Sequence, residues 1–309
     1  MNTPALRGYF RTLSSLKACT RARLARLGAI LACFTGMITA APVLALVGPA
    51  RLAPEFVPYV VMVLDTGSGD EASYCSASVI TSDIVLTAAH CVSDPSYTRV
   101  FYRGRDELVL FDVRSIAIHP GYTPNLGQED LASVDLALLR LSKPLPTLFK
   151  PVELTNSFRV KVGQQLRIVG FGIADEAERG TPGLLRTGIL SVRGPESPIF
   201  VKLIDPNGTG LGGCTGDSGA PIFAVDQLTL VAVAIRAKGN NGYSCGAVTE
   251  AVLIGPQLPW LRKSLETWSK MENQSIKVWV IGLLLAAALV AVLQRSMNRS
   301  RAVPQAKDE

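Results

Sequence analysis

The chain has 309 residues, of which 48% are hydrophobic and 18% are charged, with 31 basic and 25 acidic side chains. Residues 1–27 carry six basic and no acidic residues, and residues 277–309 carry five basic and two acidic ones. Residues 46–276 hold 20 basic and 23 acidic side chains, a net charge of −3. Because the basic excess lies at the two ends, the composition argues against a nucleic-acid-binding surface, and we expect no nucleic-acid partner.

Residues 1–45 predict an export signal. A basic leader ends at Arg26, and the apolar run LGAILACFTGMITAAPVLALV follows it. A basic region, an apolar stretch and then small residues are typical of a signal peptide. The basic region is long, so a signal anchor that stays in the membrane is the alternative.

From residue 56 onward the sequence contains many short strand-like runs. Examples are YVVMVL, DIVLTAA, VDLALLRL and LTLVAVAI, which are separated by turn-rich segments such as DTGSGDE, HPGYTPNLG and DPNGTGLGG. Short strands at this spacing predict an all-β domain of antiparallel sheet, either a sandwich or a barrel. The first helical pattern of any length is LPWLRKSLETW at 258–268, which has apolar residues on one face.

The C-terminal region predicts a membrane anchor. After a linker at 269–275, the run IKVWVIGLLLAAALVAVLQ at 276–294 is about 28 Å long as a helix, close to the hydrocarbon thickness of a bilayer. Residues 295–309 form a basic tail, which the positive-inside rule places in the cytoplasm. A buried core helix is the alternative, but the run is apolar on all sides. With a basic leader and a basic tail both in the cytoplasm, the domain between them is expected in the periplasm or at the cell exterior.

Four cysteines lie in this exported region: Cys75, Cys91, Cys214 and Cys245. An even number of cysteines outside the cytoplasm implies two disulfides, and four cysteines allow three pairings.

Three polar residues are candidates for nucleophilic catalysis. Ser218 lies in the glycine-rich stretch GLGGCTGDSGAPIF, which is either a flexible loop or a backbone bent to present one oxygen. His90 ends an apolar strand in IVLTAAHC, where an isolated histidine is more often structural. Asp135, in SVDLALLRL, is either a solvent-facing strand residue or a buried acid that orients an imidazole.

The segments LTAAHC, DLALLRL and GCTGDSGAP, in this order, resemble the three signature segments of the chymotrypsin/trypsin family of serine endopeptidases. His90 and Asp135 are 45 residues apart, and Asp135 and Ser218 are 83 residues apart. The resemblance covers residues 46 to 268 and also includes PYVVMV, HPGY, VGFG and WLRKSL. With the export signal and the anchor, the chain looks like a membrane-anchored bacterial-type member.

The resemblance implies two six-stranded antiparallel β-barrels with a C-terminal helix and an active site between the barrels. It gives His90 the role of general base, Asp135 that of orienting acid and Ser218 that of nucleophile. The backbone N–H groups of Gly216 and Ser218 would form the oxyanion hole. It pairs Cys75 with Cys91 and Cys214 with Cys245. The implied partner is a polypeptide substrate, with no cofactor and no metal.

The sequence departs from the family pattern in the specificity pocket. Gly212 stands where trypsin has an aspartate, and Ile235, Arg236 and Ala237 stand where the family usually has Ser-Trp-Gly. Without a buried carboxylate the pocket has no partner for a basic substrate side chain, so we expect small or apolar residues before the cut. These departures leave a catalytically idle, membrane-tethered binding module as the alternative.

The resemblance also implies a route to activation. In the family a new N-terminal ammonium pairs with the aspartate before the nucleophile, here Asp217. Counting back from Pro58-Tyr59 places that N-terminus at Leu46. The preceding VLA, residues 43 to 45, fits a signal-peptidase site. We therefore expect one cut after Ala45 to release the leader and to form the Leu46–Asp217 pair.

Overall fold

The structure is a computed structural model, and it describes residues 46–67, 72–104, 107–124, 133–174, 184–240 and 244–301. The expected signal segment, residues 1–45, lies outside the described residues, as does the end of the basic tail after residue 301.

The first barrel is formed by six strands in the order β2-β3-β4-β7-β6-β5, and it closes on itself. All neighbouring strands in it are antiparallel. Its strands are β2 (Val60–Asp65), β3 (Ser73–Val79), β4 (Ile84–Thr87), β5 (Thr98–Arg103), β6 (Leu108–Ile118) and β7 (Ala137–Leu141).

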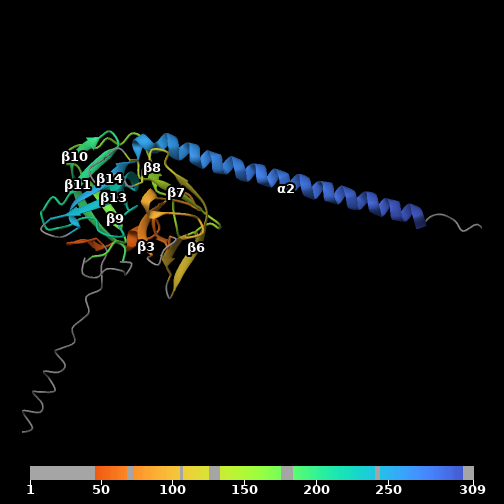
Figure 1. Ribbon diagram of the computed structural model, residues 1–309, viewed down its shortest axis with the longest axis horizontal. Coiled ribbons are helices and arrows are strands. Elements are labelled where there is room, and N and C mark those ends of the chain that lie inside the picture. Colours follow the sequence, from red (N-terminus) through yellow and green to blue (C-terminus); the bar gives the residue numbers. More distant parts are fainter. Residues whose placement is uncertain are drawn as a thin grey trace, which may run out of the picture. The chain divides into compact units, whose positions relative to one another are not determined.

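The second barrel is formed by the strands in the order β10-β11-β14-β13-β12-β9, and a pairing between β9 and β10 closes it. Figure 1 shows its strands in green to cyan, beside the orange and yellow strands of the first barrel. Its strands are β9 (Gln165–Gly170), β10 (Arg186–Ser197), β11 (Phe200–Ile204), β12 (Pro221–Ala224), β13 (Thr229–Gly239) and β14 (Gly246–Leu253). Two short strands lie outside the ring: β1 (Arg51–Leu52) pairs with β10, and β8 (Glu153–Leu154) pairs with β13. The expected all-β fold of two six-stranded antiparallel barrels is confirmed.

The core consists mainly of two clusters of buried apolar side chains. The larger one includes Val61 in the first barrel, Phe223 in the second and Trp268 in the C-terminal helix, so it crosses the junction between the barrels. The other fills the second barrel and includes Ile168 and Leu203. Because apolar packing continues across the junction, loops that leave the two barrels there are held in fixed positions relative to one another.

Helix α2 (Leu258–Arg301) begins as the amphipathic helix that the sequence predicts. Leu258, Leu261 and Trp268 are buried against the barrels. The guanidinium of Arg140 on β7 donates to the carbonyl oxygen of Trp268 at 3.2 Å and pairs with Glu272 one turn further on. The start of the helix is therefore fastened to the first barrel.

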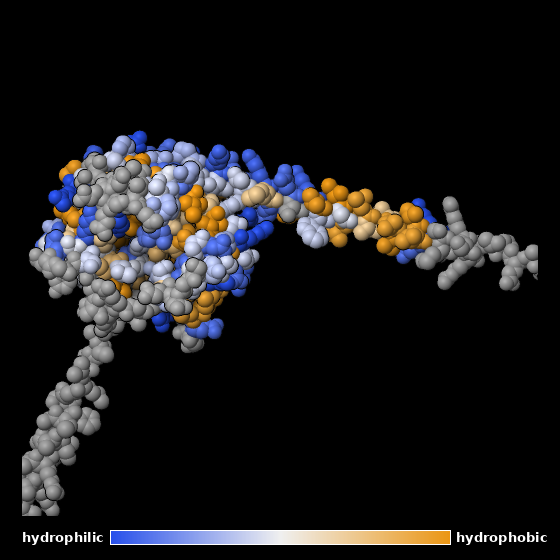
Figure 2. Space-filling view, viewed as in Figure 1, coloured by the Kyte–Doolittle hydropathy of each residue, from blue (hydrophilic) through white to orange (hydrophobic). Residues whose placement is uncertain are grey.

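The rest of α2 carries exposed apolar side chains. Residues 269–275, expected as a linker, are helical and join the packed part to the apolar part without a break. Among the described residues one helix, Gly255–Arg295, is long and apolar enough to cross a membrane, with a mean hydropathy of 2.6 over its most apolar stretch. Figure 2 shows the apolar side chains along this part of the helix. The helix is thus a candidate transmembrane segment.

Candidate active site

His90 and Asp135 meet because their strands are neighbours. β4 ends and β7 begins at the same edge of the first barrel, where Thr87 pairs with Ala137. His90 follows in a 3-10 helix (Ala89–Cys91), and Asp135 lies just before β7. The imidazole Nδ1 donates to Asp135 Oδ2 at 2.6 Å, and the His90 backbone N–H donates to Asp135 Oδ1 at 2.9 Å. The carboxylate therefore fixes both the ring and the backbone of His90, and it leaves Nε2 as the nitrogen with a free lone pair.

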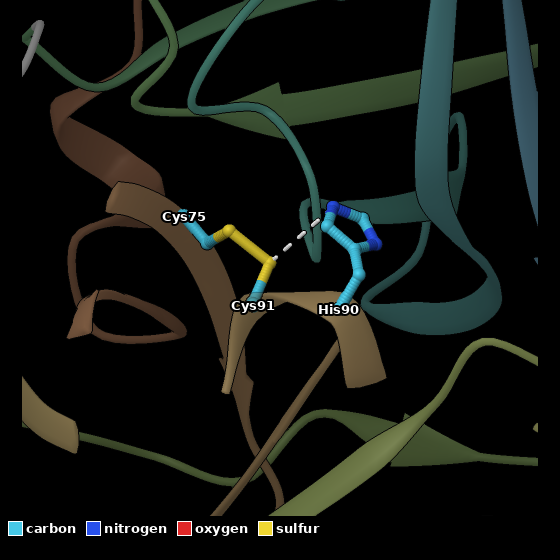
Figure 3. Close-up of side chains that lie close together, drawn as sticks. All are labelled: Cys75, His90 and Cys91. Atoms are coloured by element: carbon cyan, nitrogen blue, oxygen red, sulfur yellow. Dashed lines mark hydrogen bonds between the residues drawn. A yellow bond between two sulfur atoms is a disulfide. The ribbon is translucent and has the colours of Figure 1, made fainter. Parts of the chain in front are cut away.

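A disulfide between Cys75 and Cys91 lies beside His90, and this is the pairing that the resemblance implies. Figure 3 shows the imidazole next to the bond, with Nε2 at 3.8 Å from Cys91 Sγ. The two sulfurs and the imidazole lie within 4.8 Å of one another, as metal ligands would. Because the sulfurs are bonded to each other, they are not thiolates, the form in which cysteine binds a metal.

The loop that carries Ser218 is held tightly against the first barrel. The Ser76 backbone N–H donates to the carbonyl oxygen of Ser218 at 2.8 Å, and the Gly219 N–H donates to Ala234 in the second barrel at 2.7 Å. Gly219 has φ +80°, and a Cβ there would lie 2.1 Å from the Ser76 carbonyl oxygen. Only glycine fits this approach, so the glycine after the serine serves close packing and not flexibility.

Ser76 makes a second contact with this loop, through its hydroxyl, which the sequence does not predict. Its hydroxyl donates to the carbonyl oxygen of Gly216 at 2.9 Å and accepts from the Phe171 N–H at 3.1 Å, and its side chain is fully buried. The hydroxyl therefore orients the peptide that follows Gly216, where φ is +93°. A serine after Cys75 gives no periodic or compositional signal. Its partners, 95 and 140 residues away, become visible only in the fold.

Asp217 is buried beneath this loop. Its two carboxylate oxygens accept from the backbone N–H groups of Gly172 and Cys214, each at 2.9 Å. Burial raises the pKa of Asp217 to about 7, against the two backbone N–H groups and the charge of Arg186, which lower it. The second disulfide, Cys214–Cys245, joins this loop to the segment before β14, again as the resemblance implies.

A cavity of about 660 Å³ brings His90 and Ser218 together with three of the four expected pocket residues. Ile235, Arg236 and Ala237 line it, along with Gly216 and residues of both disulfides. Among the hydrogen bonds of the described residues there is none between Ser218 Oγ and His90, although both face the cavity. The hydrogen bonds between His90 and Asp135 are therefore present in this structure, and a hydrogen bond between Ser218 Oγ and His90 is not.

Gly212 is not among the residues that line this cavity. It forms an isolated bridge with Val47, and a Cβ at Gly212 would lie 2.9 Å from the Cα of Gly246. The site of the trypsin aspartate thus has no room for a side chain without a shift of the neighbouring backbone.

Leu46 is buried near the same loop. Its carbonyl oxygen accepts from Arg186 Nη1 at 2.7 Å, and Arg186 also donates to Ala50. Leu46 has φ +60°, and it is the one non-glycine residue in the described part of the chain with a positive φ. For a leucine this left-handed conformation is unfavourable by about 1–2 kcal/mol.

The comparisons with known proteins agree with this architecture. A family model described as Trypsin matches residues 47–253. Granzyme M of Rattus norvegicus is 27% identical over 250 residues, which cover 72% of this chain and 90% of that protein. The vitellin-degrading protease of Bombyx mori is 30% identical over 231 residues, covering 64% and 81%.

Solved structures share the fold. Neuropsin, a serine protease of mouse brain, superposes with a TM-score of 0.57 at 23% identity, covering 70% of this chain and 99% of that one. The scabies mite inactivated protease paralogue S-I1 has a TM-score of 0.54 at 24% identity, covering 68% and 95%.

The family match, together with relatives that are named as proteases, identifies the chain as a hydrolase of the serine endopeptidase class. Since the family match covers more than half of its length, the chain belongs to the trypsin family.

Proposed function

We propose that the chain hydrolyses peptide bonds with His90, Asp135 and Ser218 as a catalytic triad. His90 takes the proton of Ser218 Oγ as the oxygen attacks the substrate carbonyl, and Asp135 stabilises the imidazolium. The N–H groups of Gly216 and Ser218 bind the oxyanion. His90 then protonates the leaving amine, and water releases the acyl group by the same steps in reverse. The observation that carries the proposal is the double hydrogen bond of Asp135 to His90 at a cavity that also contains Ser218.

The test is covalent labelling with a fluorophosphonate, together with peptide turnover. Wild-type protein should be labelled, and Ser218→Ala should not. Ser218→Ala or His90→Ala should each lower kcat by roughly 10⁶, and the double variant by little more, because the residues act as a unit. Full turnover by Ser218→Ala would refute the assignment.

A catalytically idle binding module is the second candidate. The missing hydrogen bond between Ser218 Oγ and His90 favours it, and the solved structures that share the fold include an inactivated paralogue. A module of this kind would take no label at Ser218 and turn over no peptide. Catalytic hydrogen bonds are often long without substrate, which is why we prefer the active enzyme.

The preferred substrate residue before the cut is small or apolar. Gly212 has no room for a carboxylate, and Arg236, a cation, lines the cavity. A profile over Ala, Val, Leu, Phe, Arg and Lys before the cut should be lowest for Arg and Lys. A profile dominated by the two basic residues would reject this specificity.

Removal of the leader activates the enzyme. Cleavage after Ala45 would abolish the φ angle of Leu46 and with it the unfavourable conformation, because φ is defined by the preceding carbonyl carbon. The new ammonium would hold the carboxyl of Asp217 ionised, although burial raises its pKa. Protein that begins with a free Leu46 should be far more active than protein with one extra residue before it. Equal activity would contradict the proposal.

The domain works outside the cytoplasm, held by residues 276–294, as a membrane-anchored bacterial-type protein. Two disulfides in a trypsin-family domain support the location, and the exposed apolar part of α2 supports the anchor. The relatives named above are animal proteins, so the bacterial type rests on the sequence alone.

A further inference from the structure

A buried carboxylate lies among three cations, one of which, Arg236, lines the cavity of Ser218. Glu250 on β14 is 1% exposed, and its strand runs between β11 and β13. It pairs in register with Lys202 on β11 and with Arg236 on β13. Glu250 lies 3.0 Å from Arg236 Nε, 3.2 Å from Lys238 Nζ and 3.9 Å from Lys202 Nζ.

One carboxylate does not balance this charge. Even without Lys202, the two cations Arg236 and Lys238 share the single negative charge of Glu250. The side chains of Arg236 and Lys238 are 26% and 39% exposed, so the excess positive charge is in contact with solvent. A buried acid that fixes partly exposed cations pre-orders them for a ligand, because the cost of immobilising a long side chain is met within the fold.

Arg236 lines the cavity of Ser218, and its guanidinium has N–H groups that no protein atom accepts within the described residues. Glu250 contacts its guanidinium at Nε as an ion pair, and neither Nε nor the two Glu250 carboxylate oxygens form a hydrogen bond within the described residues. Its Nη1 and Nη2 donate to no protein atom within the described parts of the chain. Among the residues that line the cavity of Ser218, Arg236 is the one with a permanent charge. The planar end of a guanidinium binds a carboxylate through two parallel hydrogen bonds.

We propose that Arg236, held in place by Glu250 and supported by Lys238, is a subsite for an acidic side chain of the polypeptide substrate. It would bind an aspartate or glutamate two to four residues before the bond that is cut, because we expect a small or apolar residue directly before the cut. The subsite rests on the proposed function, because it selects among substrates of the Ser218 reaction. The charge of Arg236 would also repel the basic residues that we expect the enzyme to exclude.

The experiment compares matched peptides that differ only by Glu or Gln at the second, third or fourth position before the cut. At one of these positions the kcat/KM for the Glu peptide should exceed that for the Gln peptide by about tenfold, as for a partly exposed charge-assisted pair. The preference should shrink as the salt concentration rises, because screening weakens exposed charges. Equal kcat/KM values for Glu and Gln at all three positions would overturn the proposal.

Two variants assign the preference to Arg236. Arg236→Gln should bring the Glu/Gln ratio to about one, and Arg236→Lys should leave a reduced ratio, because the charge remains but the two-pronged contact is lost. The matched control is Arg159→Gln, which removes the same charge from a side chain at a different cavity. It should leave the ratio unchanged.

Failure of the subsite and failure of the proposed function look different. An enzyme that takes the fluorophosphonate label and cuts Glu and Gln peptides equally well retains its function and lacks the subsite. A protein that takes no label and cuts no peptide contradicts the proposed function itself. If Arg236→Gln does not fold, the ratio and its salt dependence in wild-type protein still decide the matter.

Discussion

Two buried serines on one strand differ in what their hydroxyls contact. Ser76 and Ser78 lie on β3, and both are fully buried. Ser76 Oγ bonds to Gly216 and Phe171, whereas Ser78 Oγ has no hydrogen-bond partner among the described residues. Replacing each serine with alanine therefore tests whether the Ser76 hydroxyl orders the loop at Gly216, whose N–H we propose to bind the oxyanion.

Ser76→Ala should lower kcat by about tenfold with little change in KM, since loss of an oxyanion donor itself costs about 10²–10³. Binding of a peptide boronate, which mimics the tetrahedral intermediate, should weaken in parallel. Ser78→Ala should leave kcat unchanged and keep or raise the melting temperature, because it removes an unsatisfied buried hydroxyl. Equal kcat for wild type and both variants would show that Ser76 is merely structural.

The raised pKa of Asp217 predicts how the stability of the uncleaved chain depends on pH. Its pKa is raised to about 7 in the folded state by burial, from an ordinary value of 3.8. The folded state then binds the proton more tightly, so this stabilisation is fully present below about pH 4 and is lost as the pH rises through 7. The contribution of Asp217 to the free energy of unfolding changes by on the order of 4 kcal/mol between these two pH limits.

The measurement is the free energy of unfolding in urea between pH 4 and 8, for protein that carries extra residues before Leu46. Asp217→Asn removes the titration, so the difference between the two proteins isolates this group. Other acids act in the opposite direction: hydrogen bonds from Thr98 and Ser93 lower the pKa of Asp65 against the effect of its burial, and its contribution is lost only at acid pH. A difference between wild type and Asp217→Asn that does not vary with pH would contradict the assignment.

At the scale of single elements, helix α2 has two parts that differ in what they contact. Trp268 is 7% exposed and packs into the core, whereas Trp279 on the same helix is 74% exposed. Trp268→Ala should destabilise the domain by about 3 kcal/mol, within the usual range for a buried aromatic residue. Trp279→Ala should leave domain stability unchanged. The stability of both variants is measured by thermal unfolding of the full chain in detergent. Equal melting temperatures for wild type and Trp268→Ala would mean that the start of the helix is not part of the folded domain.

Strand ends explain how much of the site the sequence could predict. His90 and Asp135 each lie beyond the end of an apolar run, and such positions meet when the two strands are neighbours in a barrel. The burial of Glu250 could not be predicted, because in GAVTEAV its local sequence is the same as that of a solvent-facing strand residue. Its burial depends on cations from two other strands. The position of Gly212 beside Gly246 depends likewise on a contact between distant backbones, which no local pattern encodes.

At the scale of the whole molecule, we expect the two barrels with the proposed active site to work independently of the proposed anchor at residues 276–294. Among the side chains of α2 that the structure describes, Trp268 is the last buried one, and the exposed Glu272 is the last to pair with the barrel, through Arg140. Deletion of residues 276–309 should therefore release soluble protein with an unchanged melting temperature and unchanged peptide turnover. Cell fractionation checks the first point. Truncated protein that stays with the membrane after loss of its leader would show that the anchor lies elsewhere.

The disulfide beside His90 makes the redox state of the compartment a condition of activity. Cys91 follows His90 directly, and Cys75 precedes Ser76, so one covalent bond fastens both the histidine turn and the strand that holds the serine loop. In the cytoplasm thiols stay reduced, and a newly made chain lacks this fastening there. With the domain outside the cytoplasm, as proposed, the bond forms after export. We therefore expect the proposed peptidase to be inactive while the chain is being made and to become active once it has crossed the membrane.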